Sequence, residues 1–496
     1  MNQTFKVVFS AARGALMVVN ELTRSVQGKG TKTVVAVAAA ALCGVAAAED
    51  LHPNTDLTLE GHSNQTQNSN ENCFGGDYSY SRTNVTAVDQ VFDGNYLGYI
   101  DEKETPDAQG GALYLNAQHA ENGGTVIKYE NTVNHFERVV FSNNTVRTNS
   151  NSGNRPSAYG GAVTLKGGTT TFLNTTFTGN KAIAEDTTAN TSSNAAYGGG
   201  SAAGGAVFVD SVRNKQNFRA SVIFSATTDI TNTGNTVQSG LKGSFTDAYG
   251  TKVPTAGGFL YQDRETMATF DIDEGVTYTV GVLDAWKTDA NMDSIASSVR
   301  VNSSVEENQL NKTGAGLFVM NGQMSDYYGI VNVQEGTLRV TSDWAVANAV
   351  NVNGGLLELG NLSFTTVKEA SGYKEADILD AAGKINVAGG ELIVSNATLK
   401  EGSIAISGTG LVHIDKLTTS GKDNITMSSG TLDLTIEQVF GSTTSTTVGE
   451  AFNLTGGTLD FSNETVTKSW LTKALSGNLN FHAEITLTPA APSSAA

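Results

Sequence analysis

Side chains that could do chemistry are few in this sequence. The densest acidic cluster is "FDIDEG", which holds Asp271, Asp273 and Glu274. Asp271 and Asp273 would share one face of a strand, because strand side chains alternate, and paired carboxylates serve enzymes that cut glycans. The same residues also fit a solvated acidic face beside a glycine turn, and we favour that interpretation.

Other catalytic and metal-binding patterns are missing from the sequence. It contains no H-E-x-x-H, G-x-S-x-G, G-D-S-G or G-x-G-x-x-G motif. The histidines, which show no ligand spacing, are His52, His62, His119, His135, His413 and His482. Cys73 has only His62 as a nearby histidine, so we interpret it as an inert thiol rather than a nucleophile. We therefore predict no catalytic, cofactor-binding or metal-binding residue and no enzyme.

The N-terminal segment has the layout of an export signal. An apolar stripe with helical spacing runs from Phe5 to Val19 and predicts an amphipathic helix. Two lysines follow, and then residues 34–48 carry no charge. Ala46 and Ala48 fit the A-x-A cleavage rule, which makes Glu49 the mature N-terminus. The apolar run is shorter than the roughly 20 residues of a membrane-spanning helix.

Residues 1–30 resemble the extended signal peptide region of autotransporters and related type V secreted proteins of Gram-negative bacteria. Phe9 stands where that family more often has Trp. The resemblance implies export by the Sec machinery, passage through the periplasm and an outer-membrane β-barrel translocator that delivers the chain to the cell surface or the medium. The matching positions are Met1, Asn2, Lys6, Val7, Val8, Phe9, Gly14, Val18, Val19, Glu21, Leu22 and Arg24.

The charge of the exported part excludes some partners. The leader contains five of the 31 basic residues and one of the 49 acidic residues, which leaves 26 basic against 48 acidic residues and a net charge of −22. Such a surface repels phosphate backbones and anionic lipids. We therefore predict no nucleic-acid partner. Cys43 lies in the leader, so Cys73 is alone afterwards and no internal disulfide is expected.

The remainder reads as an all-β chain with two alternating repeats. Short runs with period two, such as "VNVQEGTLRV", are bounded by Gly or Asn. Phe-x-x-Asn alternates with Gly-Gly-x-apolar, and "FSAT" at Phe224 reads as a fourth Phe element that has lost its Asn. The alternation is similar to the polymorphic outer membrane protein repeat of chlamydial autotransporters. The repeat positions are Phe92, Asn95, Gly110, Gly111, Phe141, Asn144, Gly160, Gly161, Phe177, Asn180, Gly204 and Gly205.

These spacings predict a right-handed parallel β-helix with extruded polar loops, following the cleaved helical leader. Stacked coils would bring repeated Phe, Asn and Gly into ladders inside the core and at the turns. Residues 147–157, 183–200 and 284–309 read as loops. About 20 coils at ~4.8 Å each would extend on the order of 95 Å.

The second half changes its motif. Residues 310–340 resemble the autotransporter-associated β-strand repeat, through Lys312, Gly314, Gly316, Leu317 to Val319, Tyr328, Gly329 and Gly336 to Val340. Similar strand starts follow at Gly355, Gly390, Gly430 and Gly457; the gaps of 35 and 40 residues are close to two coils. We predict a leader at 1–48, a β-helix with Phe-x-x-Asn repeats at 49–240, a second β-helix at 241–487, and an Ala/Pro/Ser linker at 488–496.

The favoured function is that of an exported passenger acting as a structural stalk or adhesin without catalysis, in contact with a host surface or neighbouring cells. A glycan-acting β-helix enzyme and a self-association factor remain as alternatives. The sequence ends in "TPAAPSSAA" without the alternating strands of a translocator barrel. A fragment, a truncated gene and export by a separate protein each fit that ending.

Overall fold

The computed structural model describes two compact units, residues 1–52 and 53–496. The described residues are 5–10, 15–20, 55–59, 66–68, 73–74, 78–81, 83–98, 108–121, 126–129, 131–150, 157–186, 201–211, 219–239, 255–289, 291–298, 307–366, 382–419, 423–434, 451–460, 480–481 and 486–488. Among them, no helix is both long enough and apolar enough to cross a membrane.

The first unit differs from the prediction. Strands β1 (Phe5–Ser10) and β2 (Ala15–Asn20) pair antiparallel, with Phe5 opposite Asn20 and Ser10 opposite Ala15. The predicted amphipathic helix is therefore wrong for these residues. The apolar positions of the stripe are largely valine and phenylalanine, which favour strands over helices. The cleavage residues Ala46, Ala48 and Glu49 lie outside the described residues.

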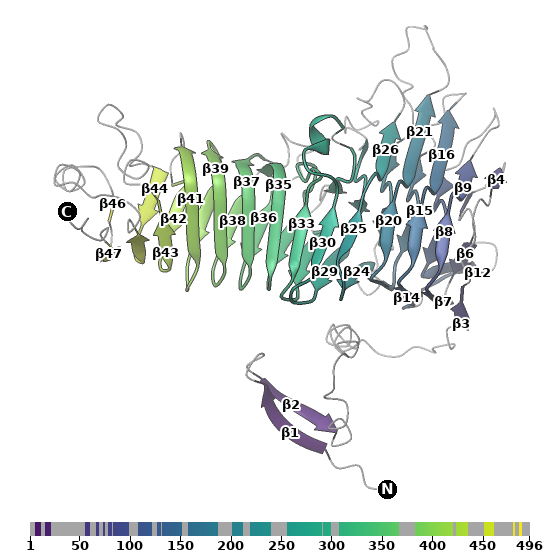
Figure 1. The fold of residues 1–496 in the computed structure, drawn as a ribbon, viewed down its shortest axis with the longest axis horizontal. Coiled ribbons are helices and arrows are strands. Elements are labelled where there is room, and N and C mark those ends of the chain that lie inside the picture. The colour runs from purple at the N-terminus through teal and green to yellow at the C-terminus, as the bar shows by residue number, and fades with distance from the viewer. Residues whose placement is uncertain are drawn as a thin grey trace. The chain divides into compact units, whose positions relative to one another are not determined.

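The second unit is a right-handed parallel β-helix, as predicted (Figure 1). One 14-stranded parallel sheet runs through all described coils. Its strands, in sheet order, are β3 (Thr55–Thr58), β7 (Thr83–Val88), β14 (Val133–Glu137), β19 (Thr169–Leu173), β24 (Ser221–Ala226), β29 (Met267–Ile272), β32 (Gln309–Thr313), β34 (Ile330–Val333), β36 (Ala349–Val352), β38 (Lys384–Val387), β40 (Ser403–Ile406), β42 (Ile425–Met427), β44 (Phe452–Leu454) and β46 (Asn480–Phe481).

Several short sheets complete the wide coils of the N-terminal part, which we call the N-terminal coils (residues 55–298). The six-stranded sheet comprises β6 (Tyr78–Ser81), β11 (Leu113–Asn116), β18 (Val163–Lys166), β23 (Val207–Asp210), β28 (Leu260–Gln262) and β31 (Ile295–Ser297). A five-stranded sheet comprises β5 (Cys73–Phe74), β10 (Ala108–Gln109), β17 (Ala158–Tyr159), β22 (Ala202–Ala203) and β27 (Thr255–Ala256).

The remaining sheets of these coils lie at the next corners. A second five-stranded sheet comprises β4 (Thr66–Asn68), β9 (Tyr96–Gly98), β16 (Thr145–Ser150), β21 (Lys181–Asp186) and β26 (Thr236–Ser239), and a three-stranded sheet comprises β8 (Val91–Asp93), β15 (Val140–Ser142) and β20 (Thr176–Thr178). Strands β12 (Gln118–Glu121) and β13 (Val126–Tyr129) form an antiparallel hairpin, and η2 (Ala285–Lys287) is a short 3-10 helix.

The C-terminal coils (residues 307–488) are narrower, because within the described residues one further sheet, which begins in the last N-terminal coils, closes them. That ten-stranded sheet comprises β25 (Ile230–Asn232), β30 (Thr277–Val280), β33 (Leu317–Met320), β35 (Thr337–Val346), β37 (Leu356–Phe364), β39 (Glu391–Leu399), β41 (Leu411–Thr419), β43 (Thr431–Asp433), β45 (Thr458–Asp460) and β47 (Thr486–Thr488). Buried and half-buried residues alternate strictly along strands such as β34 and β36, because one face of each strand points into the core.

Within the described residues the coils are fewer and larger than predicted. Fourteen strands in the long sheet correspond to roughly 60 Å at ~4.8 Å per coil, instead of about 20 coils. The gap from Gly355 to Gly390 is one coil, since Leu356 pairs directly with Glu391. The gap from Gly390 to Gly430 is two coils, as predicted, with Leu411 pairing with both Glu391 and Thr431.

Three predicted loops begin or end elsewhere. The first residues of two of them form strands, because β16 and β21 extend to Ser150 and Asp186 and pair with each other there. The third, residues 284–309, contains η2 and β31, and β31 belongs to the six-stranded sheet. Short buried strands inside a polar segment carry too little apolar pattern to be recognised in a sequence.

Candidate functional site

Phenylalanines of the Phe-x-x-Asn repeat stack on one another inside the N-terminal coils. Phe92, Phe141 and Phe177 are fully buried, with ring centroids 5.0 and 5.1 Å apart and nearly parallel planes. A second stack beside them, which the sequence analysis missed, meets the first edge to face. It consists of Phe136, Phe172, Phe224, Phe270 and Phe318, with successive centroids 5.2, 5.6, 4.9 and 4.0 Å apart.

Phe224 therefore does not have the position predicted for it. It pairs in register with Phe172, in the second stack. The rung beyond Phe177 is Asn232, whose Oδ1 accepts a hydrogen bond from the backbone N of Phe177 at 2.7 Å. In this coil the repeat has lost its Phe and kept its Asn, at Asn235. The prediction for Phe224 was therefore wrong, because in the sequence an aromatic residue is more conspicuous than Asn232.

Asparagines of the repeat form a buried hydrogen-bonded column, which we call the inner ladder: Asn95, Asn144, Asn180, Asn235 and Asp293. All five side chains have zero exposure. The Nδ2 of Asn144 donates to Oδ1 of Asn180 in the next coil at 2.9 Å, and to the carbonyl of Phe92 in the previous coil at 2.9 Å. Each amide thus satisfies buried backbone groups as well as its neighbours.

Asp293 ends the inner ladder, and the sequence analysis missed it inside a predicted loop. Its Oδ1 accepts from the backbone N and Nδ2 of Asn235 at 2.9 Å each, and Oδ2 accepts from the backbone N of Gly234 at 2.7 Å. Burial raises the pKa of Asp293 to about 6, against these hydrogen bonds. A carboxylate has no proton to donate, so the column cannot continue beyond it.

Glycine pairs of the repeat close the turns for two different reasons. The first glycine has a left-handed φ, at 76° in Gly110, 66° in Gly160 and 67° in Gly204. The second lies against the next coil: a Cβ on Gly161 would be 2.0 Å from the carbonyl O of Gly205. The corresponding distances are 1.9 Å from Gly111 to Gly161 and 2.3 Å from Gly205 to Gly258.

The acidic cluster lies at the end of β29 and in the turn after it. Asp271 and Asp273 are half-buried and flank the buried Ile272, while Glu274 is exposed. Asp271 Oδ1 accepts a hydrogen bond from Oγ1 of Thr313 in the next coil at 3.2 Å. Among the described residues, His, Cys, Asp and Glu side chains form no group of three or more that could hold a metal ion.

Lys312, a residue of the second repeat, is buried in the core, and its ammonium group points toward the turn that follows it. Nζ donates to the carbonyls of Thr313, Gly314 and Glu335 at 2.8, 2.7 and 3.1 Å. Burial lowers its pKa to about 8, although Asp271 and Glu335 oppose that shift. All three donors of the ammonium are satisfied, which explains how a cation persists there.

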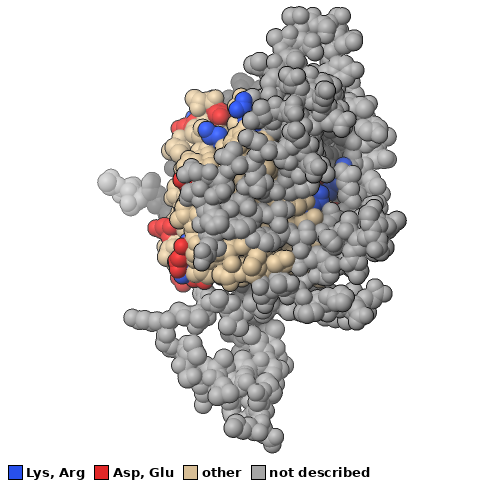
Figure 2. Space-filling view, turned by 90° about the vertical axis from the view of Figure 1, so that its right-hand side faces the viewer, with Lys and Arg blue, Asp and Glu red and all other residues tan. Residues whose placement is uncertain are grey.

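The outer surface of the C-terminal coils carries further ladders. We call Asp343, Asn361 and Asn396 the surface ladder: Nδ2 of Asn361 donates to Asp343 Oδ1 at 2.6 Å, and Nδ2 of Asn396 to Asn361 Oδ1 at 3.0 Å. Figure 2 views the molecule from the right-hand side of Figure 1, where the N-terminal coils lie; the described surface seen from there is mostly uncharged, with charged side chains at its margins. A second amide column starts at Asn311, which is buried, and continues through half-buried Asn332, Asn351 and Asn386.

Two of the six histidines are described with their side chains. His135 Nε2 lies 3.6 Å from Glu137 Oε2. His413 Nδ1 is 2.8 Å from Asp433 Oδ2 and Nε2 is 2.9 Å from Asp415 Oδ1. Burial opposes a charge on His413, but both carboxylates outweigh it and raise its pKa. Both nitrogens can donate only in the imidazolium form.

Comparison with known families identifies the leader. Residues 1–48 match the family model described as the Extended Signal Peptide of Type V secretion system. The chain is thus exported across the inner membrane toward the outer membrane or cell surface, as predicted, and type V export in general involves Sec and an outer-membrane translocator. No curated protein and no solved structure matches the chain.

Proposed function

We propose that the exported part is a surface-displayed or shed passenger that acts as a structural stalk or adhesin and has no catalytic activity. The observation that carries this proposal is the combination of a type V leader with a β-helix whose repeated residues serve stacking. The repeated Phe, Asn and Gly residues lie in the core and at the turns, where they stabilise the stacked coils. The outer surface of the C-terminal coils carries polar ladders of asparagine, one of which ends at Asp343, and such ladders suit contact with a hydrated surface.

A bead assay tests the proposal without requiring a translocator. The exported chain, residues 49–496, is coupled to fluorescent beads, which are applied to epithelial cell layers and to layers of purified glycoproteins. Retention above beads coated with an inert protein supports an adhesin. Retention at background on every surface, with a folded chain, leaves only the stalk role.

Glycan cleavage by the acidic cluster would contradict the proposal. The same purified chain is incubated with polysaccharides, and release of reducing ends is measured. Turnover that disappears in Asp271→Ala, but persists in the matched exposed-acid variant Asp343→Ala, would make the protein a glycan-acting enzyme. We expect no turnover in any of the three proteins.

Self-association has its own readout in the bead assay. Clustering of beads among themselves, lost on deletion of residues 187–200, would assign the contact to that segment. The deletion starts after Asp186, so that strand β21 stays intact. We expect dispersed beads.

A further inference from the structure

The two sheets that close the C-terminal coils present different outer surfaces. On the outer face of strands β34, β36, β38, β40, β42 and β44 of the 14-stranded sheet, Lys384 is the one charged side chain. Depletion of charged residues is the compositional mark of the centre of a contact surface. The outer face of the ten-stranded sheet in the same coils carries many ionisable side chains, among them Arg339, Glu358, His413, Asp433 and Asp460.

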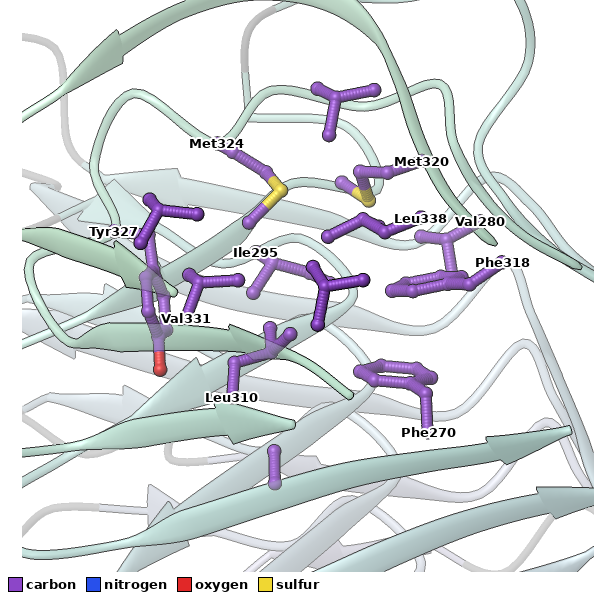
Figure 3. Close-up of a cluster of buried hydrophobic side chains, with 14 of the residues drawn as sticks. Phe270, Val280, Ile295, Leu310, Phe318, Met320, Met324, Tyr327, Val331 and Leu338 are labelled. Carbon is purple, nitrogen blue, oxygen red and sulfur yellow. The ribbon is translucent and has the colours of Figure 1, made fainter. Parts of the chain in front are cut away.

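The second amide column lies in the middle of this uncharged face. The residue before each asparagine points inward, and Figure 3 shows Leu310 and Val331 in the apolar core. Asn311 and Asn332 therefore lie on the opposite face of their strands, because strand side chains alternate. Beyond Asn386 the column continues in register through the uncharged residues Ala405, Thr426 and Asn453.

Amides of the column keep hydrogen-bonding capacity that the chain does not use. Nδ2 of Asn351 donates to Oδ1 of Asn332 at 2.9 Å, and Oδ1 of Asn351 accepts from Nδ2 of Asn386 at 2.9 Å. A carboxamide has two N–H donors and an oxygen with two lone pairs. Asn332 and Asn351 therefore each retain one N–H and one lone pair, for which the described residues supply no further partner.

Apolar side chains flank the column on the same face. Ile330 and Ala349 are half-buried and stand two residues before Asn332 and Asn351. Successive strands of a sheet are ~4.8 Å apart, so amide and apolar groups recur along the axis at that spacing. Ligand sites combine apolar contact with a few placed polar groups. A sugar ring matches both, because its hydroxyl groups donate and accept and its C–H faces pack on apolar side chains.

We propose that the outer face of β34, β36 and β38 binds an uncharged polysaccharide whose chain lies along the axis of the β-helix. This inference rests on the proposed adhesin function and names the class of its ligand. Charge argues against other occupants of the face. The exported part has 26 basic and 48 acidic residues, and its net charge of −22 repels an anionic glycan and a second copy of the chain. An uncharged glycan meets no such repulsion.

Affinity electrophoresis of the exported chain, residues 49–496, tests the proposal. The gels contain dextran, soluble starch, galactomannan or xyloglucan, which are uncharged, or alginate, which is anionic. We expect retardation of the chain by at least one of the uncharged polysaccharides and no retardation by alginate. Retardation by none of the uncharged polysaccharides would overturn the proposal, as would retardation by alginate alone.

A charge placed on the face should abolish the retardation. Ala349→Glu adds a charged side chain beside the column without removing an amide, and we expect binding to weaken about tenfold or more because the ligand must desolvate the carboxylate. Ala345→Glu is the matched control, since Ala345 is a half-buried strand residue on the outer face of the ten-stranded sheet. It should bind like the unmodified chain. Asn351→Ala, which removes one donor and one acceptor, should weaken binding about fivefold.

The remaining outcomes separate this site from the adhesin function. Circular dichroism checks that each variant is folded. Equal retardation of Ala349→Glu and the unmodified chain would overturn the proposal, as would a dimer in sedimentation velocity that is lost in Ala349→Glu. In the bead assay, equal retention of Ala349→Glu and unmodified beads on cell layers would keep the adhesin function and remove this face from it. Background retention of both, with polysaccharide binding intact, would keep the site and contradict the adhesin function.

Discussion

The N-terminal and C-terminal coils both stack along one parallel sheet, but they differ in the length of each coil and in where their amide columns lie. In the N-terminal coils, successive rungs of the inner ladder are 49, 36, 55 and 58 residues apart, and the turns depend on buried amides and glycine pairs. In the C-terminal coils, rungs such as Asn311, Asn332 and Asn351 are 21 and 19 residues apart, and members of the column after Asn311 are half-buried rather than fully buried.

The difference teaches where polar repeats are needed. A wide coil has more corners, and its backbone groups at those corners are buried, so side-chain amides must satisfy them. A narrow coil has two long strands, and the ladder bonds between successive strands pair much of its backbone. The N-terminal coils should therefore be sensitive to single changes of a buried amide that the surface columns of the C-terminal coils tolerate. Glycine changes do not separate the two regions, because a Cβ on Gly383 would also lie 2.0 Å from a backbone carbonyl O, that of Val346.

The largest effect is expected from Gly161→Ala. Its Cβ would lie 2.0 Å from the carbonyl O of Gly205, a backbone atom that cannot move without the coil. We expect a loss of about 5 kcal/mol in the free energy of unfolding, or failure to fold. Urea denaturation of the exported chain measures it. Gly275→Ala is the control in which a Cβ meets free space, because nothing lies near its Cβ; it should lose only about 1 kcal/mol, which comes from its own positive φ of 75°.

Truncation of a stacked ring should cause the second-largest loss in the free energy of unfolding. Phe141 stacks between Phe92 and Phe177, so Phe141→Ala should cost about 4 kcal/mol by leaving a cavity. Leu357→Ala in the C-terminal coils, which is equally buried, should cost about 3 kcal/mol because no ring stack is interrupted. A larger loss at Leu357 than at Phe141, by the same urea measurement, would contradict the comparison.

Removal of one amide from each kind of column should lower the free energy of unfolding much more in the N-terminal coils than in the C-terminal coils. Asn180→Ala leaves the backbone N and Nδ2 of Asn144 and the carbonyl of Phe141 without their partner, at about 3 kcal/mol. Asn396→Ala in the surface ladder should cost about 0.5 kcal/mol or less, because water replaces the amide. Equal losses would show that burial of the inner ladder is not what makes it important.

The smallest effect is expected at His413, on the outside of the C-terminal coils. Its raised pKa means that its ion pairs stabilise the fold below the unfolded value near 6.5 and that this contribution is lost as the pH rises through the folded value. Solvent screens the pairs, so the contribution is about 0.5 kcal/mol. Melting temperatures of the chain and of His413→Gln should differ at pH 6 and converge at pH 9; a constant difference would contradict this.

Much of the architecture could be predicted because stacking demands repetition. Period-two runs with glycine boundaries predicted an all-β chain, and the alternation of two motifs predicted a parallel β-helix. The number of coils could not be predicted, because loops of different length separate equivalent residues. The gap of 35 residues between Gly355 and Gly390 looks like two coils in the sequence and is one coil in space.

The functional details were harder to predict for a related reason. The leader has many fixed positions in one short segment, and its export role was correctly predicted. Asp293 lies in a polar stretch that has no repeat pattern, and only stacking brings it onto Asn235. The partners of His413 are Asp415, two residues away, and Asp433, one coil away. The contact with Asp433 could not be predicted from the local sequence.

The direction of the amide columns has a consequence for how such a chain can change its length. Internal rungs of the inner ladder are interchangeable, since each asparagine both donates and accepts along the column. Duplication of the coil that holds Asn144 would add a rung and preserve every bond. Duplication of the coil that holds Asp293 would place two carboxylates face to face. In evolution, insertion and loss of coils should therefore be tolerated on the N-terminal side of Asp293 and resisted at the coil that contains it.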